Sequence, residues 1–121
     1  MNDTNVSTYH LLHLRLDTAE RLMEMERAGA ILDFSQWERL TYDDDGNVID
    51  EQRCFGGWYC YWSYGNAHPH IALKSVKIRD HFDLSMSDAS ALFGGSYMGW
   101  RPLSYRVERL DAILLARGVR L

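Results

Sequence analysis

Two cysteines and two histidines near the centre of the chain are the residues best suited to binding a metal ion. They are Cys54, Cys60, His68 and His70, which lie within seventeen residues of one another. A structural zinc ion takes four thiolate or imidazole ligands in a tetrahedron, and its paired cysteines are usually about two to four residues apart. Five residues separate this pair. We therefore expect no bound cofactor, with a metal-stabilised fold as the alternative.

The spacing of the two cysteines also argues against a disulfide. On a helix, six residues turn the chain by about 600°, which leaves the two side chains about 120° apart. On a strand they would lie about 20 Å apart, whereas a disulfide needs Cα atoms within about 7 Å. We expect reduced, buried thiols, as in a cytoplasmic protein.

No motif predicts catalysis. The stretch from Gly94 to Met98 approaches a nucleophile elbow around Ser96, but Met98 occupies the place of the second glycine. Glycine-rich phosphate-binding loops are absent from the sequence. Five histidines and many acids allow so many triads to be imagined that the sequence selects none of them. We expect a protein that is not an enzyme, and an unrecognised hydrolase is the remaining enzymatic alternative.

The charges are unevenly divided along the chain. Residues 1–52 carry four arginines and twelve acids, whereas residues 53–121 carry nine basic residues and five acids. Such a division can steer a partner, but it also arises when two faces of one domain neutralise each other. Nucleic-acid binding is an alternative that we consider unlikely, because solvated helix faces often carry such side chains. It would use Lys74, Lys77, Arg79, Arg101, Arg106, Arg109 and Arg117.

A glycine-framed segment from Gly94 to Pro102 contains the residue types that are enriched at protein interfaces. We expect a docking surface formed by Tyr97, Met98, Trp100 and Arg101. The alternative is that Trp100 packs inward against the helix that follows.

We expect an acidic turn to extend this docking surface through Asp43, Asp44 and Asp45. Alternating aspartates before a glycine are also found in calcium loops. Here Thr41 and Gln52 occupy the first and twelfth ligand positions, where a calcium loop needs carboxylates. A solvated hairpin tip is the better interpretation.

The elements that must position these residues are mainly helices. Apolar spacing and stop signals predict a helix from Ser7 or Thr8 to Gly29, with an apolar stripe of Leu12, Leu16, Ala19 and Met23. An extended segment from Tyr9 to Leu16 followed by a shorter helix is the rival. Further helices are expected over residues 71–82, after the capping box at Ser85, and from Pro102 to Gly118.

An Asp45-Gly46 pair between β-forming residues predicts a β-hairpin near residues 39–50. The aromatic stretch 57–64 is ambiguous. Its aromatic residues favour a strand, whereas Trp58, Tyr61, Trp62 and Gly65 share one helical face. We expect a short buried helix, and a buried strand is the alternative. The predicted fold is α+β and mainly α, with four to five helices and one small hairpin, in a single domain over residues 1–121.

Membrane insertion is not expected. The longest apolar run, from Ala112 to Ala116, is far shorter than the roughly 20 residues that span a bilayer. The start of the chain lacks the basic and apolar regions of a signal peptide. We expect a soluble, cytoplasmic protein.

The order of several short motifs resembles that of small uncharacterised proteins of phages, prophages and bacteria. These motifs are Phe34 to Trp37, the Cys- and Gly-bearing segment from Cys54 to Gly65, the helix ending at Phe93, and Arg109 to Asp111. The resemblance implies a helical central segment and a mobile-element origin, and it carries no activity.

Together these observations favour a protein-binding module without enzymatic activity. The most concrete form of this hypothesis is an inhibitor, encoded by a phage or mobile element, of a host complex such as CRISPR or another defence system. Its partner would be a host protein or ribonucleoprotein. A small metal-stabilised or nucleic-acid-binding regulator is the alternative.

Overall fold

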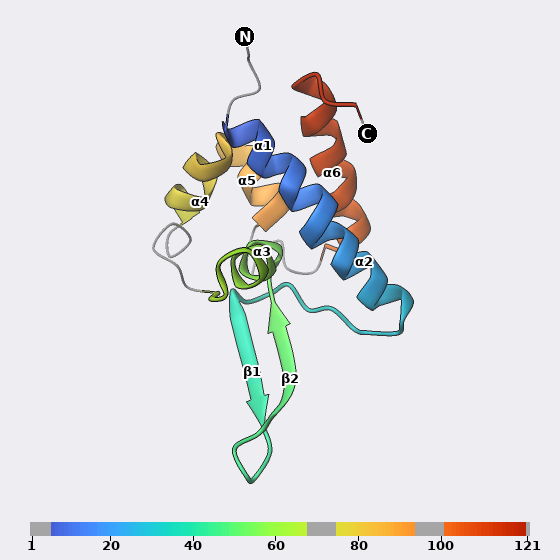
Figure 1. The fold of residues 1–121 in the computed structure, drawn as a ribbon, viewed down its shortest axis with the longest axis vertical. Coiled ribbons are helices and arrows are strands. Elements are labelled where there is room, and N and C mark those ends of the chain that lie inside the picture. Colours follow the sequence, from blue (N-terminus) through green and yellow to red (C-terminus); the bar gives the residue numbers. More distant parts are fainter. Residues whose placement is uncertain (1–5, 68–74, 94–100, 121) are drawn as a thin grey trace.

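The first helical run crosses the whole body of the protein (Figure 1). A computed structural model describes residues 6–67, 75–93 and 101–120 of the chain. The run consists of α1 (Val6–His13), a π-helical segment η1 (Leu14–Ala19) and α2 (Glu20–Arg27), and it ends at Gly29 with a φ of 98°. The continuous helix is therefore confirmed, and the extended alternative for residues 9–16 is excluded.

The buried face of this run is centred beside the predicted stripe and overlaps it. Its most buried residues are Leu11, Leu14, Thr18, Ala19 and Leu22. Of the predicted stripe, Ala19 is fully buried and Leu12 and Met23 pack partly buried against the core, whereas Leu16 is exposed. The prediction is therefore wrong for Leu16, and the spacing gave no sign that the polar Thr18 is buried.

The predicted hairpin is present and projects away from the helices (Figure 1). Strand β1 (Glu38–Tyr42) pairs antiparallel with β2 (Val48–Arg53), with Glu38 opposite Arg53 and Tyr42 opposite Val48. Gly46 takes a φ of 85° in the turn. We call residues 38–53 the hairpin arm.

The aromatic stretch forms helix α3 (Phe55–Tyr64), so the strand alternative is wrong. Cys54 caps this helix, and its Sγ accepts a hydrogen bond from the Gly57 amide at 3.4 Å. Gly65 ends it with a φ of 71°. Propensity favoured a strand, but the cap at Cys54, the left-handed stop at Gly65 and the burial of the aromatic face together favour a helix.

Three further helices complete the helical body: α4 (Ser75–Phe82), α5 (Met86–Phe93) and α6 (Leu103–Ala116). Ser85 caps α5 as predicted, and its Oγ accepts a hydrogen bond from the Asp88 amide at 3.1 Å. The first residues of the predicted helix 71–82 lie outside the described residues. The fold is therefore α+β and mainly α, as expected, and no described helix is long and apolar enough to cross a membrane.

A single connected cluster of buried side chains joins the first helical run to α3, α4, α5 and α6. Helix α3 supplies Phe55, Trp58, Tyr59 and Cys60 to it. Arg106 of α6 is also fully buried, and its Nη1 donates to the Leu92 carbonyl at 2.8 Å. This corrects the expectation that Arg106 faces water, because its guanidinium lies over the Phe34 ring and its Nη1 is directed to a backbone carbonyl.

Candidate functional site

The hairpin arm carries an excess of negative charge equal to the net charge of the protein. It contains six acids and two arginines, a net charge of −4, which equals that of the whole chain. The rest of the chain has eleven acids and eleven basic residues. Arg53 is buried and paired with Glu38 and Glu51 at 3.0 and 3.1 Å. The acidic surface is therefore concentrated at the outer end of the arm.

The arm ends in an ordered acidic turn. Oδ1 of Asp43 accepts hydrogen bonds from the amides of Asp45 and Asn47, both at 2.9 Å. These bonds, led by the one from the Asn47 amide, hold the pKa of Asp43 below its usual value. Asp44 and Asp45 are exposed and make no ion pair with a described residue. The turn therefore uses Asp43 for its own structure and presents two further carboxylates.

Apolar side chains lie directly behind this acidic turn. Tyr42 and Ile49 are 55% and 63% exposed, and Val48 is also exposed. An exposed two-stranded hairpin with apolar side chains and open edges is a common surface for protein recognition. The arm therefore combines charge with apolar area that the described residues leave uncovered.

The root of the arm is held tightly against α3. The guanidinium of Arg53 lies over the rings of Trp58 and Tyr61, with its Cζ 4.8 and 3.8 Å from their centroids. A Cβ added to Gly57 would lie only 2.3 Å from the Trp37 carbonyl oxygen. Only glycine at this position allows the backbone before β1 to approach the helix so closely.

The predicted docking segment is only partly described. Tyr97, Met98 and Trp100 lie outside the described residues, so their placement stays a prediction. Arg101 is partly buried, and its guanidinium lies 4.6 Å from the centroid of the Tyr105 ring. This contact directs Arg101 along α6.

The metal hypothesis gains no support from the described half of its ligand set. Cys54 and Cys60 are buried free thiols, and burial raises the pKa of Cys54 and raises that of Cys60 to about 12. His68 and His70 lie outside the described residues. Among the described residues, no three His, Cys, Asp or Glu side chains are placed to hold a metal ion.

A second candidate site lies where α1, α3 and α4 meet. We call it the histidine cluster, and it comprises His10, His13, Asp17, Tyr59, Ser63, Tyr64 and His81. The rings of His10 and His81 stack with centroids 4.1 Å apart. The hydroxyls of Tyr59 and Tyr64 lie 3.0 and 3.5 Å from Nε2 of His81.

Burial sets the protonation of this cluster. It lowers the pKa of His81 to about 4, and the neighbouring His10 adds to the effect. Burial likewise lowers the pKa of His10 and raises that of Tyr59. The stacked pair is therefore neutral at physiological pH, which is the state in which two imidazoles can stack without repulsion.

His13 links the cluster to an acid and to a hydroxyl. Its Nδ1 contacts Oδ2 of Asp17, four residues later on the same helix, and its Nε2 lies 3.3 Å from Oγ of Ser63. The sequence did not select this set among its many possible combinations. Spacing on the predicted helix pairs His13 with Asp17, but nothing local indicates that Ser63 is their neighbour.

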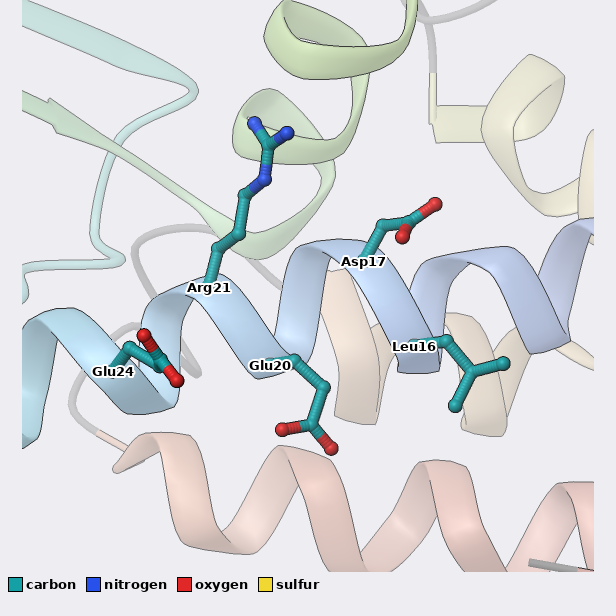
Figure 2. A pocket seen from close by; sticks show the side chains of 5 residues that line it. All are labelled: Leu16, Asp17, Glu20, Arg21 and Glu24. Carbon is teal, nitrogen blue, oxygen red and sulfur yellow. The ribbon is translucent and has the colours of Figure 1, made fainter.

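A surface hollow of about 270 Å³ lies along η1 and α2. It is lined by Leu16, Asp17, Glu20, Arg21 and Glu24, and Figure 2 shows Arg21 directed towards α3. The Arg21 guanidinium lies 5.1 Å from the centroid of the Trp62 ring. The hollow therefore adjoins the last turn of α3.

No family model, curated protein or solved structure matches this chain. The resemblance to small phage and bacterial proteins stays a prediction from the sequence. Any function must therefore be argued from the two candidate sites themselves.

Proposed function

We propose that this protein is a binding module whose hairpin arm docks on a basic surface of a partner protein or ribonucleoprotein. The observation that carries the proposal is the concentration of net charge on a projecting arm with exposed apolar side chains. Opposite charge steers encounter and selects partners, while apolar contact contributes the affinity. The exposed carboxylates of Asp44 and Asp45, which we call the tip of the arm, favour a partner surface that carries positive charge.

The resemblance to phage and prophage proteins extends this proposal to a specific role. An acidic arm seated on the basic groove of a nucleic-acid-binding complex would occupy the place of phosphates and block the complex. We therefore propose an inhibitor of a host defence complex, such as a CRISPR ribonucleoprotein, as the concrete form of the function. Nucleic acid itself is a poor occupant, because phosphates and the arm carry the same charge.

A photo-crosslinking residue in place of Ile49 tests the proposal in host cells. We expect one protein to be crosslinked from the arm, through a lysine- or arginine-rich peptide identified by mass spectrometry. The matched control places the same residue at Leu115, which is exposed on α6. Equal capture from both positions, or a captured peptide without basic residues, would contradict the proposal.

A pair of charge-matched variants tests the role of the tip. Asp44→Asn with Asp45→Asn removes two carboxylates from the arm, and Glu24→Gln with Glu26→Gln removes two exposed carboxylates from α2. Asp43 is left in place because its side chain holds the turn. We expect the first pair to reduce the Ile49 crosslink strongly and the second to leave it intact, whereas crosslinking unaffected by the tip pair would contradict a basic partner surface.

A further inference from the structure

Three polar side chains form a row along the first helical run and face the last turn of α3. His13, Asp17 and Arg21 follow one another at intervals of four residues, about one turn of helix. His13 contacts Ser63, and Arg21 stacks on Trp62, the residue before it. The row therefore brings a base, an acid and a cation to the same part of α3.

The order of contacts in this row sets the proton positions. The Asp17 carboxylate is an acceptor, so it is matched by a proton on Nδ1 of His13. In the neutral imidazole, Nε2 then carries the lone pair, and it is this atom that lies 3.3 Å from Oγ of Ser63. A hydroxyl facing a base that is oriented by a carboxylate is the arrangement of an activated serine nucleophile.

The arrangement is open to small molecules. The His13 and Asp17 side chains are 35% and 55% exposed. The hollow of about 270 Å³ includes Asp17 in its lining, together with the apolar side chain of Leu16 and the charge of Arg21 (Figure 2). A small ester could therefore approach the exposed His13 and Asp17 side chains, beside which the Ser63 hydroxyl lies.

We propose that Ser63 is a nucleophile that accepts an acyl group from activated esters, with His13 as its general base and Asp17 as the positioning residue. The Oγ–acyl bond forms while the bond from the acyl carbon to the leaving oxygen breaks. The Ser63 proton passes to His13 Nε2 and from there to the leaving oxygen. Water then hydrolyses the acyl-serine, releases the carboxylic acid and restores the hydroxyl.

The position of Ser63 restricts the class of donor. In the last turn of a helix the backbone amides are used by the helix itself, so they offer no oxyanion hole. Only donors whose leaving group needs little stabilisation, such as aryl esters, match this site. The activity is independent of the hairpin arm and goes beyond the proposed binding function.

A fluorophosphonate probe on the full chain tests the proposal, because it phosphonylates activated serines with loss of fluoride. We expect one added group, which peptide mapping places on Ser63 of the unaltered chain. Ser63→Ala should abolish the modification, and His13→Gln should slow it about 100-fold. Ser104→Ala is the matched control, since Ser104 is an exposed helical serine that hydrogen-bonds to no described histidine, and it should change nothing.

Hydrolysis of 4-nitrophenyl acetate should show the same order of rates: unchanged in Ser104→Ala, slowed in His13→Gln and abolished in Ser63→Ala. Melting temperatures close to that of the unaltered chain establish that a variant is folded. Absence of modification, modification mapped to another residue, or an equal rate in the His13→Gln variant would each overturn the proposal. The peptide map of the unaltered chain decides the site without any variant, so a variant that fails to fold does not remove the test.

Discussion

The hairpin arm and the histidine cluster are stabilised by opposite kinds of contact. The arm is local in sequence, exposed and charged, and only its root touches the core. The cluster joins residues from three separate helices through neutral, partly buried rings. The difference indicates that the arm can tolerate surface substitution beyond its root, whereas the cluster responds to the loss of single atoms and to acid.

The largest effect is expected at the root of the arm, where the two regions meet on α3. Gly57→Ala would place a Cβ 2.3 Å from the Trp37 carbonyl oxygen, a backbone atom that cannot move alone. We expect a loss of about 3 kcal/mol in the free energy of unfolding, measured by urea denaturation. The control Ser104→Ala should change it by less than about 0.5 kcal/mol. A Gly57→Ala protein as stable as the control would show that the root is loosely held.

A smaller effect is expected from a single hydroxyl of the histidine cluster. Tyr59→Phe removes the oxygen that lies 3.0 Å from His81 Nε2 and leaves that partly buried nitrogen without this partner. We expect a loss of about 1–2 kcal/mol in the free energy of unfolding. The matched control is Tyr64→Phe, because Tyr64 is exposed and its hydroxyl is 3.5 Å from the same nitrogen. If both variants lost the same free energy of unfolding, the greater burial of the Tyr59 hydroxyl would not explain its contribution to stability.

Lowering the pH should show the difference between the two regions without any mutation, because it should reduce the stability contributed by the histidine cluster. The pKa of His81 is lowered to about 4 in the folded protein, so below its ordinary value of 6.5 the unfolded chain binds more protons than the folded one. Stability from this group is full above pH 6.5 and is lost as the pH falls towards 4. His10, also lowered, adds to the loss, while His13, Asp17, Tyr59 and Tyr64 are the other titratable groups of the cluster.

We expect the urea midpoint to fall between pH 7 and pH 5. The matched variant His81→Phe keeps an aromatic ring without a titrating nitrogen, and its midpoint should depend less on pH over this range. A midpoint equally pH-dependent in both proteins would place the acid sensitivity outside the cluster.

The smallest effect on stability is expected at the tip of the arm. Asp44→Asn with Asp45→Asn changes exposed carboxylates that pair with no described cation, so the free energy of unfolding should change by less than about 0.5 kcal/mol. Differential scanning calorimetry of this variant beside Glu24→Gln with Glu26→Gln measures the change. A clear loss in the tip variant alone would mean that these carboxylates serve the fold.

Most of the architecture could be predicted from the sequence, because its signals are local. Gly29, the Asp45-Gly46 pair and Ser85 mark a helix end, a turn and a cap through their own backbone preferences. The aromatic stretch was ambiguous, since its residues favour strands and its environment favours a helix. Burial of Arg106 could not be predicted, because it depends on the Phe34 ring and on the Leu92 carbonyl, which other segments of the chain supply.

The candidate sites were less predictable than the fold. The acidic tip was identified because its carboxylates are adjacent in sequence. The contact between His13 and Ser63 joins residues fifty positions apart, and no local spacing signals it. The cysteines attracted attention through their chemistry, yet they serve as a helix cap and as core packing.

The most direct test of the binding function is the affinity of the protein for the partner captured through Ile49. Isothermal titration calorimetry would compare the unaltered chain, Asp44→Asn with Asp45→Asn, and Glu24→Gln with Glu26→Gln. We expect the tip pair to weaken binding about tenfold at low salt and the α2 pair to weaken it less than about twofold. Equal affinity of all three proteins, or an equal loss in both variants, would contradict the claim that the hairpin arm recognises its partner by charge.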